Sequence, residues 1–245
     1  MLVDQIRLHE QLMLLALSNE QGTLALKEGK LRRAMACGIM AELLKMGRID
    51  LSPEEADGVV SLRSDDMEDE LLQECQVLIR DSEKIRPVTY WVSRISRFPK
   101  LRRRVAMGLC RLGILEHSEE TVFLFFNREK FPEVNPEPEQ ALVCRLREAV
   151  LGERTDLDLE TTLILMLCTL SGLLSNHFDR EDLDRRRERI ELVASGRLLE
   201  ESASTPSQIR QAQSLKALAH ALGQSEPEEM DGSTDDAHPE FAAAS

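Results

Sequence analysis

Two groups of basic residues are the best candidates for binding chemistry, because each surrounds the predicted start of a helix. Helix N-termini carry free backbone N–H groups and the positive end of the helix dipole, and both attract anions. The first group consists of Lys27, Lys30, Arg32 and Arg33, and the second of Arg94, Arg97, Lys100, Arg102, Arg103 and Arg104. The contacts we expect to an anion are Lys27, Arg33, Lys100, Arg102 and Arg103.

A proline-bearing loop over residues 127–138 is a second candidate, because it carries Arg128, Lys130 and Phe131. Near a membrane, an aromatic ring enters the interfacial region while cations meet the headgroups. The sequence thus predicts that these three residues contact a membrane. The alternative for all of the basic residues is an ordinary solvated surface, paired with the surplus carboxylates.

Residues that carry catalysis or bind metals are scattered along the chain. The five histidines are His9, His117, His177, His220 and His238, and none shows H-x-x-x-H or H-E-x-x-H spacing. The five cysteines contain no C-x-x-C pair, and nucleophile-elbow, phosphate-loop and dinucleotide motifs are absent. We therefore expect no enzyme, no cofactor and no metal site.

The overall charge limits the choice of partner. With 31 Lys+Arg against 44 Asp+Glu, the formal net charge is −13, which on average repels nucleic acids and anionic membranes. Binding to phosphate must therefore come from a local cluster. The first seven residues lack the basic start and apolar run of a signal peptide, which favours a cytoplasmic protein.

The element that should organise the fold is the apolar segment 162–174, which lies between charge-rich flanks. It is shorter than the roughly 20 residues that span a bilayer, so it predicts a core helix, over 160–178, wrapped on all sides. We expect a mainly α fold: one helical domain over 1–223 around this helix. The acidic stretch 224–245 cannot bury a core and is predicted to be a disordered tail.

Two short β-hairpins are expected besides the helices. The first pairs residues 48–51 with 58–62 across a turn containing Pro53. The second pairs 114–117 with 121–126, with Ser118, Glu119 and Glu120 as its turn. One continuous charged helix is predicted over 181–194.

Several segments of the sequence, in order, resemble the Golgi phosphoprotein 3 family. These are residues 7–17, 20–23, 40–49, 102–115, 123–132, 148–151 and the apolar segment, so the resemblance covers roughly 5–222. It implies a mainly α-helical single domain around a central hydrophobic helix. It also implies a non-enzymatic, cytosolic peripheral membrane protein like the eukaryotic members, which bind phosphatidylinositol 4-phosphate and retain glycosyltransferases in the Golgi. Anionic phospholipid and membrane-protein tails are then the expected partners.

The resemblance also locates the family's headgroup site. Lys27 stands at the family's tryptophan position, Ala36 at its first arginine, and Pro99 and Arg102 at its later basic pair. Lys27, Lys100 and Arg103 are placed to supply the positive charge of the headgroup site where the family's own residues are missing. These replacements favour a divergent, bacterial member of the family.

Two other functions are compatible with the same residues. A basic helix followed by a hairpin, as in 101–126, is also typical of a winged-helix nucleic-acid binder. The net charge argues against it, because DNA binding draws on many phosphate contacts. The third function is a helical scaffold whose partner is a protein.

Overall fold

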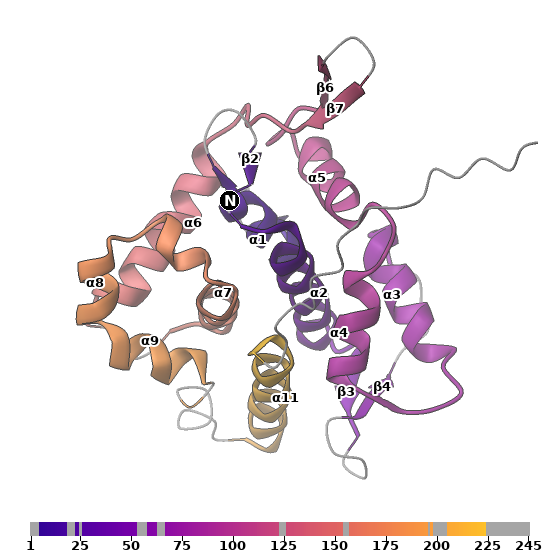
Figure 1. Ribbon diagram of the computed structural model, residues 1–245. Helices are drawn as coiled ribbons and strands as arrows, with labels where there is room; N and C mark the ends of the chain where they lie inside the picture. Colours follow the sequence, from indigo (N-terminus) through magenta and orange to yellow (C-terminus); the bar gives the residue numbers. More distant parts are fainter. Residues whose placement is uncertain are drawn as a thin grey trace, which may run out of the picture.

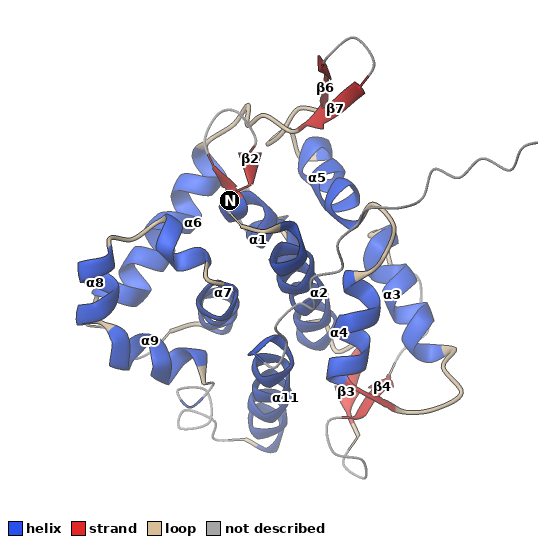
Figure 2. Ribbon diagram, in the orientation of Figure 1, coloured by secondary structure: helices blue, strands red, loops and turns tan. Residues whose placement is uncertain are grey.

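The computed structural model describes residues 5–18, 23–24, 26–52, 58–62, 67–122, 126–153, 157–195, 197 and 205–223. Most of them are helical, as predicted, and short antiparallel strands lie at the periphery (Figure 2). Residues 224–245, the expected tail, lie outside the described residues. No helix among those described is both long and apolar enough to cross a bilayer.

Helices α1 (Leu8–Ala16) and α2 (Glu28–Lys45) lie side by side in the middle of the molecule (Figure 1). Every residue of α1 is buried. The two backbones approach closely at Gly38, where an added Cβ would lie 3.0 Å from the Cα and N of His9. The small residues of α2 therefore set the distance between the two helices.

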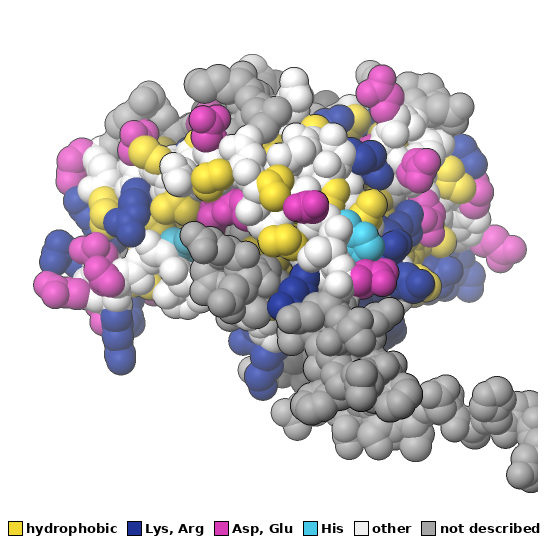
Figure 3. All heavy atoms as spheres, turned by 90° about the horizontal axis from the view of Figure 1, so that it is seen from above, with side chains coloured by type: hydrophobic (Ala, Val, Ile, Leu, Met, Phe, Trp, Pro, Cys, Tyr) yellow, Lys and Arg dark blue, Asp and Glu magenta, His cyan; other side chains and the backbone are white. Residues whose placement is uncertain are grey.

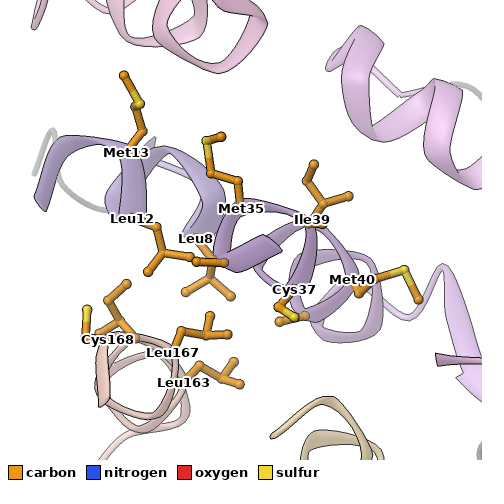
Figure 4. Close-up of a cluster of buried hydrophobic side chains, with 14 of the residues drawn as sticks. Leu8, Leu12, Met13, Met35, Cys37, Ile39, Met40, Leu163, Leu167 and Cys168 are labelled. Carbon is orange, nitrogen blue, oxygen red and sulfur yellow. The ribbon is translucent and has the colours of Figure 1, made fainter. Parts of the chain in front are cut away.

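Helix α7 (Leu159–Ser171) is the predicted apolar helix, and Thr161 to Cys168 are all buried. It packs against α1, α2, α6 (Glu137–Leu151), α9 (Arg187–Ala194) and α11 (Pro206–Gly223). Its Leu163, Leu167 and Cys168 face Leu8 and Leu12 of α1 (Figure 4). The expectation of a buried central helix is thus confirmed, although α2 shares the centre with it.

The predicted end of this helix at Phe178 is wrong. Gly172 adopts the left-handed conformation, with φ of 82°, and ends α7 at Ser171. A 3₁₀ turn, η2 (Leu173–Asn176), follows. The charged helix predicted over 181–194 is likewise divided at Arg186, into α8 (Arg180–Arg185) and α9.

Helices α3 (Glu70–Arg80), α4 (Val88–Ser96) and α5 (Leu101–Arg111) lie on the side of α1 and α2 that is away from α7 (Figure 1). Helix α11 comes later in the chain than these helices and packs against α2, α4 and α7. The side chains of Leu218 and Ala217 are buried there. A single connected hydrophobic core therefore includes both sides of the molecule.

The strands within the described residues form three small sheets. The pair β1 (Leu17–Ser18) and β2 (Thr23–Leu24) was not predicted. The first predicted hairpin is present as β3 (Ile49–Leu51) and β4 (Gly58–Ser61), and β5 (Arg86–Pro87) adds a third strand to it.

The second hairpin is present, but its predicted register is wrong. β6 (Ser118–Val122) pairs with β7 (Phe126–Lys130), so the expected turn residues 118–120 lie in a strand. Ile114 and Leu115 are buried, with 0% and 2% of their surfaces exposed, and Leu115 bridges Glu133 in the same register in which Ser118 pairs with Lys130. The predicted first strand therefore ended too early, because residues 118–122 continue it.

Several polar side chains are buried beside α1. Glu42 of α2 is fully buried, and its carboxylate accepts the N–H of Leu8 at 3.1 Å and lies 3.0 Å from Nζ of Lys45. It satisfies a donor at the start of α1, where helix geometry leaves N–H groups without an acceptor. Glu10 is buried between α1 and α5, and Gly108 of α5 leaves room for its carboxylate.

Glu10 should make stability depend on pH. Burial raises the pKa of Glu10 to about 7 from its usual value of 4.5. Its contribution to stability is therefore fully present below pH 4.5 and is lost as the pH rises through 7. Glu10→Gln should remove this loss, so that between pH 5 and 8 the wild type loses on the order of 2 kcal/mol more unfolding free energy than the variant.

Urea unfolding of both proteins at several pH values measures this difference. Burial lowers the pKa of the neighbouring His9 to about 4, so His9 also affects the pH profile. Because His9 is present in both proteins, the difference between them reports on Glu10. Parallel pH profiles for the two proteins would contradict the prediction.

Candidate anion-binding surface

The start of α5 presents two basic side chains that have no partner among the described residues. Lys100 precedes the helix with φ of 53°, a left-handed conformation, and its side chain is exposed. Neither Lys100 nor Arg102 forms an ion pair or hydrogen bond with any described residue. The first N–H groups of α5 have no acceptor within the helix. The N–H of Leu101 donates to the carbonyl of Phe98, so charge and N–H donors occur together from Arg102 onward.

The start of α2 lies next to it. Arg32 donates from Nε to the carbonyl of Ser96 and from Nη2 to the carbonyl of Phe98, both at 2.7 Å. Its guanidinium thus meets the carbonyl end of α4, where a cation is favourable. These two bonds hold the first turn of α2 against the junction between α4 and α5. Two groups that are about 70 residues apart in sequence therefore form one surface.

We call this basic surface the α2–α5 surface, defined by Lys27, Lys30, Arg33, Lys100 and Arg102. Lys27 and Lys30 are exposed, and Arg33 is half-buried. Viewed from the β6–β7 side, Lys and Arg side chains gather where Figure 1 shows α3 to α5, with acidic side chains between them (Figure 3). This surface combines residues from both predicted groups.

Arg103 and Arg104, also on α5, are engaged by acids. Nε of Arg103 lies 2.6 Å from Oε1 of Glu129, and Nη2 of Arg104 lies 2.5 Å from Oε2 of Glu74. The hydrogen bond from Arg103 is the largest cause that holds the pKa of Glu129 below its usual value. Arg103 therefore differs from Lys100 and Arg102, because an anion must compete with Glu129 for it.

The expected membrane contact of Phe131 is corrected by the structure. Its side chain is only 2% exposed, and its ring lies 5.4 Å from that of His117, between centroids. Phe131 follows β7 directly and turns into the core, so it has no surface to offer a membrane. Lys130 is half-buried, and the side chain of Arg128 lies outside the described residues.

The other family headgroup positions are also placed. Ala36 is fully buried in α2, so the position of the family's first arginine is closed to a ligand. Pro99 lines a groove of about 520 Å³ between α3 and α4, together with Trp91 and Arg94. Of these positions, Lys27 and Arg102 are the ones that present charge to solvent.

One cluster was missed by the sequence analysis. Ligand atoms of His117, Glu119 and Glu129 lie within 4.8 Å of one another at the base of the β6–β7 hairpin. The members come from two strands, so no spacing motif marks them. The available signal was the spacing of His117 and Glu119, which lie two residues apart and so share one face of a strand. The predicted hairpin placed Glu119 in the turn, and this concealed the signal.

Comparison with known protein families agrees with this architecture. A family model described as Golgi phosphoprotein 3 (GPP34) matches residues 8–213. The matched range begins with α1 and ends within α11, so it contains both helix starts of the α2–α5 surface. Because the match covers most of the 245 residues, the chain belongs to the Golgi phosphoprotein 3 family.

Proposed function

We propose that this protein is a non-enzymatic peripheral membrane protein that binds anionic lipid headgroups through the α2–α5 surface. Family membership supports an adaptor of this kind. The observation that carries the proposal is the pair of hydrogen bonds from Arg32 to the carbonyls of Ser96 and Phe98. They hold the start of α2 against the junction between α4 and α5, which supports a shared basic surface on a chain whose formal net charge is −13.

The expected affinity follows from the opposing charges. Each lysine or arginine close to an anionic surface contributes about 1 kcal/mol. Lys27, Lys30, Lys100 and Arg102 together therefore supply about 4 kcal/mol of attraction to an anionic membrane surface. The negative charge of the rest of the protein is felt over a Debye length of about 10 Å at 0.1 M salt. Binding is thus weak, sensitive to salt, and confined to one orientation.

The lipid that we propose is a phosphorylated one, with phosphatidylinositol 4-phosphate as the first candidate. Arg102 is the headgroup residue kept from the family, while Lys27 replaces the aromatic residue and Ala36 the first arginine. Lys100 and Arg103 are placed to supply charge, Arg103 only after release from Glu129. The membrane face is then the cytoplasmic one, and tails of membrane proteins are the proposed protein partners.

Reversing the two unpaired charges should abolish vesicle binding. In co-sedimentation at low salt, wild-type protein is expected to bind vesicles containing phosphatidylinositol 4-phosphate. Lys100→Glu/Arg102→Glu should lower the bound fraction at least tenfold, because two attractive contacts become repulsive.

The matched control is Arg185→Glu/Arg187→Glu, which changes the net charge equally on α8 and α9. There Arg185 pairs with Glu181 and Asp182, and Arg187 with Asp184, as in an ordinary solvated helix surface. This variant should bind almost as well as the wild type. Equal losses in both variants would reduce the effect to net charge and contradict a local site.

The same assay separates the other two functions. Binding to duplex DNA in place of vesicles would support the winged-helix alternative, in which α5 and the β6–β7 hairpin face the nucleic acid. Pairing of Arg103 and Arg104 with Glu129 and Glu74 makes that surface a poor one for phosphates. If the protein binds neither vesicles nor DNA at low salt, the remaining function is that of a helical scaffold for a protein partner.

A further inference from the structure

We propose that His117, Glu119 and Glu129 form a binding site for a divalent transition metal, with Zn²⁺ the preferred ion. One ligand atom from each side chain lies within 4.8 Å of the others. The site is at the base of the β6–β7 hairpin, adjacent to Arg103 of α5. The metal site stands on this geometry alone, whereas its effect on membranes, argued below, rests on the proposed function.

Strand geometry explains why the three side chains converge. His117 precedes β6 and Glu119 lies two residues later, so both point to the same side of the strand. Glu119 is paired directly with Glu129 across the hairpin. Residues opposite each other share a face of the sheet, so the second carboxylate joins the first two groups. Two like charges directly opposite are unfavourable, although Arg103 already pairs with Glu129.

His117 is already oriented for a ligand. Its ring packs against Phe131, with centroids 5.4 Å apart. Its Nε2 atom is shielded from solvent, and the acceptor that the described residues offer it is Oε1 of Glu129, at a long 3.4 Å. A buried ring nitrogen with so poor a contact is costly, and a metal ion would satisfy it. Two ligands of tetrahedral zinc are about 3.4 Å apart, since each bond is 2.0–2.1 Å long.

The donor set selects among metals. One imidazole nitrogen and two carboxylate oxygens suit Zn²⁺, whereas Mg²⁺ and Ca²⁺ prefer oxygen ligands alone. Three protein ligands leave a fourth position for water. Zn²⁺ should therefore bind at this site and Mg²⁺ should not displace it.

Metal binding should also release Arg103. Oε1 of Glu129 is the atom that Arg103 contacts at 2.6 Å and the one nearest to His117. A cation on this oxygen repels the guanidinium and takes its acceptor. Arg103 is then free to join Lys100 and Arg102, and the ion itself adds two positive charges. Zn²⁺ is therefore expected to strengthen anion binding, and by linkage an anion strengthens Zn²⁺ binding.

Calorimetric titration of the full chain with Zn²⁺ tests the site itself. Glu119→Gln and His117→Ala should each weaken the strongest binding event at least tenfold. Two controls should leave it unchanged: Glu116→Gln removes an equal charge next to His117, and Cys144→Ser removes the exposed thiol. Equal affinity in Glu119→Gln and the wild type, or weakening by Cys144→Ser, would overturn the site.

Vesicle co-sedimentation with and without saturating Zn²⁺ tests the release of Arg103. Zn²⁺ should raise binding of the wild type severalfold. It should leave Glu119→Gln unchanged, a variant that keeps the contact between Arg103 and Glu129. Because Zn²⁺ also binds lipids, an equal rise in both proteins would overturn the coupling.

The outcomes distinguish this inference from the proposed function. Site-specific Zn²⁺ binding without vesicle binding under any condition overturns the lipid function and the coupling, and supports the metal site. Vesicle binding that depends on Lys100 and Arg102 but is unaffected by Zn²⁺ overturns the coupling and supports the lipid function.

Discussion

Replacing Leu167 with Asp is expected to lower the free energy of unfolding by about 4 kcal/mol, the range reached by uncompensated buried charges. Leu167 is fully buried in α7 and faces α1 (Figure 4). The side chains drawn around it in Figure 4 are apolar, so they would offer a carboxylate at this position neither a cation nor a hydrogen-bond donor. Either the charge is desolvated or the carboxyl group binds a proton, and both reduce stability.

Urea unfolding monitored by circular dichroism measures this loss. Leu167→Met is the control, because it nearly conserves volume and should cost less than about 1.5 kcal/mol. The penalty of the aspartate should shrink at acid pH, where protonation removes the charge. A Leu167→Asp variant as stable as the wild type at neutral pH would show that α7 is not enclosed.

Replacing Gly38 with Leu is expected to cost about 3 kcal/mol, the upper part of the usual range for overpacking. A Cβ at this position would already lie 3.0 Å from the Cα and N of His9 and from Cδ1 of Leu12. The remaining atoms of a leucine would enter α1 itself. The two helices must then separate, and the loss extends to every contact between α1 and α2.

The same helix offers a matched control in Gly29. It lies in the first turn of α2, is exposed, and an added Cβ there meets nothing within 4 Å. Gly29→Leu should be neutral or stabilising by up to about 1 kcal/mol, because leucine favours a helix more than glycine does. Thermal or urea unfolding that gave equal stabilities for the two variants would rule out a close approach at Gly38.

The sequence was sufficient to predict the helical class and α7, because an apolar run between charged flanks leaves few alternatives. It also identified both basic groups, since the types and positions of Lys27 and Lys100 are visible in one dimension. It could not show that the groups meet. That depends on Arg32, whose acceptors are two backbone carbonyls more than 60 residues away.

Register was the main source of error. Leu115 does lie in the hairpin register, since it bridges Glu133, but the predicted strand ended at His117 although β6 continues it to Val122. Placing the turn at 118–120 separated Glu119 from Glu129. Glu42 was missed for another reason: a single acid within an apolar helix gives no sign that the start of α1 lies above it.

The position of α11 has a consequence for synthesis of the protein. Its buried side chains Ala212, Leu218 and Ala219 complete a core whose other walls, α2, α4 and α7, lie earlier in the chain. Translation produces those walls first, so apolar surface stays uncovered until α11 has left the ribosome. During that interval the nascent chain is a substrate for chaperones and is prone to aggregate. Contacts between α2 and α11 span more than 160 residues, so the last step of folding is a slow, long-range closure.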